Sequence, residues 1–164
     1  MARKQAGTPA LDALTAAGVT FTAHEYDHAA TRHFGDETVA VLGVPPSRVF
    51  KTLVANVTGS GRPELVVGVV PVSGHLDLKA LAAAVGAKRA DMADPAVAQR
   101  SSGYVVGGIS PFGQRTRLRT VVDASAMACE TVLVSGGRRG LQVELDPSDL
   151  VRQTDAVVAE IGRD

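Results

Sequence analysis

The chain has 164 residues, 45% of them hydrophobic and a single one cysteine, and its formal net charge at pH 7 is zero. This length fits one domain with a full core, and the lone Cys129 excludes an internal disulfide and fits a reducing cytoplasm. No apolar run has the length of a membrane-spanning helix, and the N-terminus lacks the continuous apolar segment of a signal peptide. We therefore expect one cytoplasmic domain over residues 1–164, with a flexible N-terminus at residues 1–7 and no membrane partner.

The first part of the chain predicts short helices and a β-hairpin. Capping residues, closing glycines and apolar spacing mark the helices, and period-2 alternation marks the strands. In chain order the predicted elements are a helix from Thr8-Pro9 to Gly18, a strand at 19–26, a loop at 28–35, a helix from Asp36 to Gly43, and a hairpin with strands at 47–57 and 64–72 joined by TGSGRP.

The rest of the chain predicts two helices, then mostly strands, and then a C-terminal helix. In chain order the predicted elements are a helix at 76–85 that stops at Gly86, a helix from Asp94-Pro95, strands at 103–106, 116–123, 131–134 and 141–145, and a helix from Pro147 with apolar residues at Leu150, Val151, Val157, Val158 and Ile161. Strands and helices do not alternate as repeated βαβ units. We therefore predict an α+β domain with a mixed, largely antiparallel sheet and flanking helices.

Two stretches indicate a ligand pocket. In YVVGGISPFG, residues 104–113, an apolar run breaks into paired glycines that can expose backbone N–H groups to a ligand. In VFKTL, residues 49–53, Lys51 lies within an apolar strand, where burying an ammonium is costly. A snorkelling lysine on an edge strand is the alternative, but the apolar neighbouring strand favours a ligand-facing ammonium. Together they suggest a pocket for an anionic or carbonyl-bearing ligand.

HEYDH, residues 24–28, matches the zinc-protease pattern H-E-x-x-H. That chemistry needs both histidines one turn apart on a helix, whereas this segment continues an alternating strand. Four residues along a strand span about 13 Å, which is too far for one zinc ion. We interpret the match as chance and expect no metal.

Cys129 and the SGGRRG segment are weaker candidates. Nothing around Cys129 in the sequence lowers the pKa of a thiol, so a buried structural cysteine is the better interpretation. SGGRRG, residues 135–140, lacks the Walker order of a phosphate loop. It is equally consistent with a glycine hairpin that exposes arginines and with a phosphate site that uses the Ser135 hydroxyl.

Several segments in order resemble the YbaK family of trans-acting aminoacyl-tRNA editing proteins, in particular the free-standing Cys-tRNA(Pro) deacylases. The same domain is inserted in some bacterial prolyl-tRNA synthetases. The resemblance runs from about Thr8 to the C-terminus. The matching segments are HEYDH, HFGDE, VFKTLV, VVPVSGHLDLKALAAAVGAKRADMADP, GYVVGGISPFGQ and VSGGRRG.

The resemblance implies hydrolysis of the ester between a wrong amino acid and tRNA(Pro), because a hydrophobic synthetase pocket excludes smaller amino acids poorly. It implies Lys51 as the central polar group and the amides of Gly107 and Gly108 as oxyanion donors. It implies the substrate's own thiol as nucleophile, and no cofactor. The remaining residues that it implies for substrate binding are Tyr26, Phe34, Thr52, Ile109, Ser110 and Ser135.

One position departs from the family pattern, since Gln142 stands where we expect an aspartate in many relatives. Two alternatives stay open: deacylation of Ala-tRNA(Pro) or another mischarged tRNA by water, and a non-catalytic module that binds tRNA ends. The expected partner is mischarged tRNA(Pro) through its acceptor end, with prolyl-tRNA synthetase as a second partner that the resemblance suggests, and no DNA. We also expect the basic stretch from Arg115 to Arg139 to contact tRNA phosphates weakly.

Overall fold

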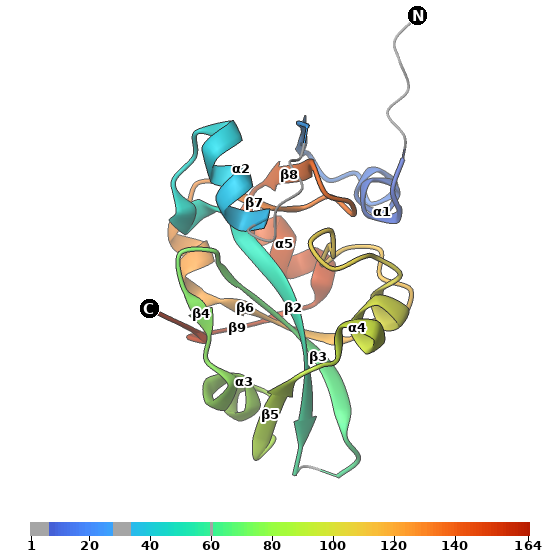
Figure 1. Cartoon of the computed structure of the whole chain (residues 1–164), viewed down its shortest axis with the longest axis vertical. Coiled ribbons are helices and arrows are strands. Elements are labelled where there is room, and N and C mark those ends of the chain that lie inside the picture. The colour runs from blue at the N-terminus through green and yellow to red at the C-terminus, as the bar shows by residue number, and fades with distance from the viewer. Residues whose placement is uncertain (1–6, 28–33, 60) are drawn as a thin grey trace, which may run out of the picture.

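The computed structural model describes residues 7–27, 34–59 and 61–164, with the backbone alone at 34–37. The described residues form a central five-stranded sheet in the order β5-β2-β3-β6-β9 (Figure 1). Only the β3–β6 and β6–β9 pairs are parallel. The strands are β2 (Phe50–Thr58), β3 (Glu64–Pro71), β5 (Arg89–Met92), β6 (Arg119–Asp123) and β9 (Val157–Ala159).

A second, antiparallel sheet packs against the first. It has the order β1-β8-β7, and a parallel bridge between Val49 and Leu133 joins it to the start of β2. Its strands are β1 (Thr22–Glu25), β7 (Val132–Ser135) and β8 (Leu141–Leu145). The two sheets confirm the predicted α+β architecture with mixed, largely antiparallel pairing.

The core has two parts, one on each face of the central sheet. Val54 and Val69 on one face belong to the same buried cluster as Val134 and Val143 of the second sheet. On the other face the valines of β2, β3 and β6 pack against α3 and the buried Ile161. Burial of valine and leucine is therefore what holds the second sheet over one end of β2.

Short helices surround the sheets, and three of them begin where the sequence predicts, at Thr8-Pro9, Asp94-Pro95 and Pro147. The helix predicted at 76–85 begins later, at Leu78, because His75–Leu76 forms a short strand. The side chains of Thr8, Asp77, Asp94 and Asp146 each accept a hydrogen bond from a first-turn amide. No helix in the described ranges is long and apolar enough to cross a membrane. The helices are α1 (Pro9–Ala16), α2 (Phe34–Leu42), α3 (Leu78–Ala84), α4 (Pro95–Ser102) and α5 (Pro147–Thr154), with 3-10 turns η1 (Pro46–Arg48) and η2 (Ala124–Ala128) and a small strand pair of β4 (His75–Leu76) and β10 (Gly162–Arg163). The helix expected from Asp36 begins two residues earlier, at Phe34.

The strand predicted at 103–106 is wrong, because this segment forms turns. Gly103 ends α4 in a left-handed conformation with φ +83°. The buried Tyr104 hydroxyl donates to the Phe112 carbonyl at 2.7 Å, and burial raises the pKa of Tyr104 to about 12. Its aromatic ring thus anchors a loop where the apolar run had indicated a strand.

The C-terminal helix is shorter than predicted. It ends at Thr154, and Asp155 follows in a left-handed conformation with φ +52°. The next residues become β9 beside β6, and Asp123 accepts hydrogen bonds from the Ile161 and Gly162 amides at 2.9 and 2.8 Å. Val157 and Val158 therefore belong to the sheet edge.

Candidate functional site

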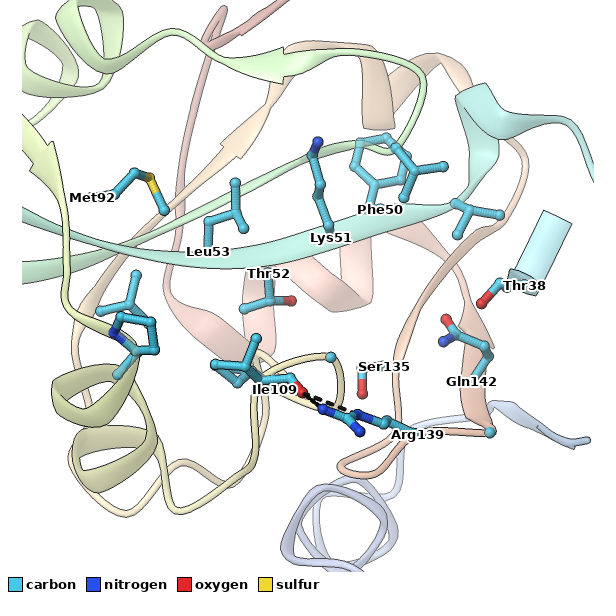
Figure 2. Close-up of a pocket in the computed structure, with 18 of the residues that line it drawn as sticks. Thr38, Phe50, Lys51, Thr52, Leu53, Met92, Ile109, Ser135, Arg139 and Gln142 are labelled. Carbon is cyan, nitrogen blue, oxygen red and sulfur yellow. Dashed lines mark hydrogen bonds between the residues drawn. The ribbon is translucent and has the colours of Figure 1, made fainter. Parts of the chain in front are cut away.

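The main pocket lies where the edge of β2 is open. On this edge β5 pairs with β2 only over Ala55–Thr58, and β7 meets it through the bridge between Val49 and Leu133, so among the described residues no strand pairs with the edge between them, at Thr52. A cavity of about 460 Å³ lies there. Its walls come from β2, α2, the start of α4, the loop at 106–109 and the turn between β7 and β8 (Figure 2).

The direction of the β2 backbone follows from two hydrogen bonds. The Val49 carbonyl accepts from Val72 toward β3, whereas the Val54 carbonyl accepts from Ala93 on the opposite side. Backbone groups alternate along an antiparallel strand, so Thr52 directs both its N–H and its C=O toward the open edge. The pocket therefore has a backbone donor and a backbone acceptor in one wall.

Two buried side-chain atoms in the pocket have no partner among the described residues: Thr52 Oγ1 and Gln142 Oε1. Thr52 is 9% exposed and Gln142 8%. Figure 2 shows Thr52 on the same side of β2 as Ile109, and Gln142 beside Thr38. A buried polar atom without a hydrogen bond costs about 1–3 kcal/mol, and a ligand that supplies the bond removes this cost. These two atoms are the strongest sign of a polar ligand.

Lys51 also lines the pocket and is half-buried, but it lies on the other face of the strand. In Figure 2 its side chain and that of Leu53 point away from Thr52. The pocket follows the strand edge, so both faces of β2 contribute to it. The structure thus brings Lys51 to the pocket without placing it beside the Ser135 hydroxyl.

The two glycine segments meet through their backbones. A Cβ atom at Gly108 would lie 2.8 Å from Arg138 Cα, which leaves no room for a side chain. Gly107 lines the pocket with φ +90°, but the Gly108 amide donates to the Val105 carbonyl at 2.8 Å. The expectation that both amides serve as oxyanion donors therefore needs correction, because the turn already uses the amide of Gly108.

Other expected residues fall into different places. Tyr26 lines the pocket with its hydroxyl 2.6 Å from Thr38 Oγ1, and Ser135 lines it while accepting from the Gly137 amide at 3.2 Å. Ser110 is fully buried, and its hydroxyl accepts from the Phe112 amide at 3.2 Å. It shapes the loop and is absent from the described pocket lining, contrary to expectation. The Phe34 side chain lies outside the described residues.

The arginines of SGGRRG make internal contacts. Arg139 donates from Nε and Nη2 to the Val106 carbonyl at 3.2 and 2.9 Å, which ties the two glycine segments together beside the pocket. Arg138 pairs with Glu25 at 2.6 Å. This segment joins β7 to β8 as a glycine hairpin, one of the two interpretations of its sequence.

The HEYDH segment enters β1, as predicted, with its second histidine outside the described residues. His24 Nε2 lies 2.8 Å from Glu144 Oε1. Hydrogen bonds from the Thr131 hydroxyl and from His24 hold the pKa of the Glu144 carboxyl below its usual range, although burial opposes this. His24 therefore belongs to a polar cluster that holds β1 on β8.

Cys129, expected to be buried, is half-buried, with Sγ 3.7 Å from the Ser125 carbonyl.

Comparison with known proteins identifies the domain. The sequence profile of the aminoacyl-tRNA editing domain matches residues 28–153. The chain belongs to this editing family. It is 38% identical over 141 residues to EbsC of Enterococcus faecalis, a candidate Cys-tRNA(Pro)/Cys-tRNA(Cys) deacylase, and the match covers 84% of this chain and 83% of that one. It is 36% identical over 73 residues to the Escherichia coli Ser/Thr-tRNA deacylase ProXp-y, 44% of each chain.

Solved structures share this editing fold. The hypothetical protein APE2540 superposes with a TM-score of 0.84 at 26% identity, over 95% of this chain and 100% of that one. A candidate trans-editing enzyme for prolyl-tRNA synthetase superposes with a TM-score of 0.79 at 22% identity, over 99% and 100% of the two chains. The editing domain is thus an aminoacyl-tRNA deacylase of the YbaK family, and its substrate class is mischarged tRNA.

Sequence reasoning missed part of the pocket. It had no signal for Thr38 on α2, for Met92 at the end of β5 or for the Arg139 contact. It noted Gln142 only as an unusual residue. The signal that was available is the alternation of β8, which places Gln142 on the face of the sheet opposite to the core residues Leu141 and Val143, beside Ser135 of β7.

Proposed function

We propose that this editing domain removes cysteine from Cys-tRNA(Pro). The observation that carries the proposal is the pocket at the open β2 edge, with its unpartnered Thr52 and Gln142 oxygens. A cavity of about 460 Å³ is large enough for a small amino acid and the ester that joins it to a ribose. The EbsC relative, named for Cys-tRNA(Pro) and Cys-tRNA(Cys), supports this choice of substrate. Prolyl-tRNA synthetase would be the partner that supplies the mischarged tRNA.

In this proposal each pocket residue binds or polarises the ester. The Thr52 backbone and hydroxyl hold the acyl group, and Gln142 Oε1 accepts a hydrogen bond from a donor on the ligand. Lys51 contacts the terminal nucleotide or the ester from the other side of the strand. The Gly107 amide stabilises negative charge on the carbonyl oxygen, and Arg139 fixes the neighbouring Val106 carbonyl.

The nucleophile in this proposal is the substrate thiol. Of the residues described around the pocket, none is a histidine, an acid or a cysteine, so none is an obvious general base. The thiolate sulfur attacks the ester carbonyl carbon and forms a C–S bond in a small ring. The bond from that carbon to the ribose oxygen then breaks, and the ribose oxygen takes up a proton. Water subsequently opens the cyclic thioester and releases cysteine.

Two alternatives remain from the sequence. Hydrolysis of Ala-tRNA(Pro) or of another mischarged tRNA by water keeps the domain and changes the nucleophile. The ProXp-y relative, which is named a Ser/Thr-tRNA deacylase and matches 44% of this chain, supports the alternative that the substrate carries an amino acid without a thiol. A module that binds tRNA ends without catalysis is the other alternative.

The proposal predicts a rank order among esters on one tRNA. Cysteine-, alanine- and proline-charged tRNA(Pro) should be compared side by side, by release of labelled amino acid. We expect cysteine to be released at least about tenfold faster than alanine, which lacks a thiol, and proline to be retained. Fastest release of alanine would favour the water mechanism, and release of none of the three would favour the binding module.

A second prediction concerns the unpartnered hydroxyl of Thr52. Thr52→Val keeps the shape of the side chain and removes the hydroxyl, so deacylation should fall about tenfold while the melting temperature stays constant or rises. Ser101 is a matched control, because its Oγ is also buried without a partner in the described part of the chain but lies outside the pocket lining. Ser101→Ala should leave deacylation unchanged. Equal rates for Thr52→Val and wild type would show that the ligand makes no bond to this hydroxyl.

A further inference from the structure

A run of sequence beside the pocket is rich in arginine and free of acids. Residues 95–122 contain four arginines and no aspartate or glutamate. This run covers α4, the loop that follows it and most of β6. The charged side chains of this run are therefore all positive.

The fold gathers three of these arginines at one end of α4. The Arg115 amide donates to the Ser102 carbonyl at 2.9 Å, and the Thr116 amide donates to the Ser101 carbonyl at 3.0 Å. The loop thus folds back against the last turn of the helix, so that the backbone at Arg115 and Thr116 lies beside Ser102 and Ser101, and Arg100 and Arg117 are the next residues along each segment. All three side chains are exposed. We name Arg100, Arg115 and Arg117 the arginine ridge.

The ridge differs from the other arginines near it. Arg119 pairs with Glu64 at 2.8 Å, and Arg138 pairs with Glu25 at 2.6 Å. Within the described ranges, no carboxylate lies within ion-pair distance of any ridge arginine. Arg115 and Arg117 therefore belong to the expected basic stretch, Arg100 extends it, and all three are available to an external anion, whereas Arg138 and Arg139 bond to groups of the domain itself.

The ridge is also close to the pocket. Pro95 and Ala98 of α4 line the pocket, and Arg100 follows Ala98 by two residues, about 3 Å along the helix axis and on the outer face of the helix. A second cationic group, Arg62, Lys88 and Arg89, lies at the far end of the β2–β3 hairpin, because Arg62 is in the turn and the Lys88 amide donates to the Thr58 carbonyl at 3.0 Å. Arg89 pairs with Thr58 in the sheet, and Thr58 lies six residues, about 20 Å along β2, from Thr52 in the pocket. This second cationic group is therefore far from the pocket.

We propose that the arginine ridge binds the phosphate backbone of the tRNA acceptor arm while the 3′ end occupies the pocket. The proposal rests on one part of the proposed function, namely that the pocket binds the 3′ end of a tRNA. Guanidinium groups bind phosphates through paired N–H donors, and such contacts position a nucleic acid without reading its sequence. The ridge adds affinity for the tRNA body and takes no part in ester cleavage.

The test compares two triple variants with the same change in charge. One carries Arg100→Glu, Arg115→Glu and Arg117→Glu, and the control carries Arg62→Glu, Lys88→Glu and Arg89→Glu. Binding of uncharged tRNA(Pro) is measured over a range of salt concentrations. We expect the ridge variant to bind at least about tenfold more weakly and its salt slope to fall by about two to three, since each lost phosphate contact removes about 0.9. The control should behave as wild type.

A minimal substrate separates this proposal from the proposed function. Cysteinyl adenosine ester has no tRNA body, so the ridge variant should cleave it at the wild-type rate. Weaker tRNA binding by the ridge variant supports the ridge even if the wild-type domain cleaves no ester, an outcome that would overturn the proposed function alone. Unchanged tRNA binding, an equal loss in the control variant, or a loss of activity on the minimal ester would overturn the ridge.

Discussion

Lys51→Ala should lower the rate of deacylation by at least about a hundredfold, equivalent to about 2.7 kcal/mol of transition-state stabilisation, while the fold is preserved. Lys51 is the cation that β2 contributes to the pocket, and it is half-buried between apolar strand neighbours. An ammonium held there can stabilise charge on the ester or the adjacent nucleotide far better than one in water. The measurement is single-turnover release of cysteine from Cys-tRNA(Pro), with circular dichroism as the check on folding.

Lys51→Met is the informative companion, because it keeps most of the aliphatic stem and removes only the charge. We expect it to be as inactive as Lys51→Ala. Lys79→Ala, at an exposed position of α3, is the control and should keep full activity. Activity of Lys51→Ala within about threefold of wild type would mean that less than about 1 kcal/mol was lost and that Lys51 is not central.

A cysteinyl ester should be cleaved at least about a hundredfold faster than a seryl ester on the same tRNA, although the two amino acids are similar in size. In the proposed mechanism the substrate thiol attacks its own carbonyl, and an intramolecular nucleophile gains a large effective concentration. A hydroxyl is a much weaker nucleophile at neutral pH than a thiol, which is partly ionised. The two esters should be compared under single-turnover conditions at saturating enzyme.

Two controls distinguish the substrate thiol from other nucleophiles. Cys129→Ser should retain the wild-type rate, which would exclude the only thiol of the protein. Treatment with a chelator should also leave the rate unchanged, as expected if no metal takes part. Matching rates for the two esters would contradict the mechanism and would indicate water bound by the enzyme.

Local rules predicted the elements whose ends the sequence marks. The helix starts at Thr8-Pro9, Asp94-Pro95 and Pro147 depend on hydrogen bonds and proline geometry within a few residues, and the β2–β3 hairpin depends on two β-rich runs joined by a short turn. These interactions are nearly independent of the rest of the chain. They were therefore visible before the structure.

Long-range contacts decided the elements that sequence reasoning got wrong. Val157 and Val158 have a spacing compatible with a helix, but β6 offers an open edge on which they form a parallel strand. Val105 and Val106 look like strand residues, but the burial of Tyr104 and the turn at Gly107 take them out of the sheet. Neither long-range contact can be inferred from the local sequence of the segment.

The same distinction holds for the pocket. The sequence and its family resemblance led us to expect ligand contacts at Lys51, Thr52 and Gly107; the structure places all three around the cavity, and their contact with a ligand stays a prediction. It also suggested Gly108 and Ser110, whose polar groups turn out to bond within their own loop. Whether a hydroxyl or an amide faces a ligand or its own loop depends on side-chain and turn geometry that a sequence pattern does not contain.

The open edge of β2 has a consequence for the solubility of the domain. An uncovered strand edge is a template on which a strand from another chain can add, which begins aggregation. Here α4 and the turn between β7 and β8 wall the edge in, and the contact of Gly108 with Arg138 brings two of the surrounding loops together. The segments that form the pocket walls therefore also block the addition of a strand from another chain at this edge. A substitution at Gly108 would push the two loops apart. It would therefore distort the pocket and also expose the β2 edge to aggregation.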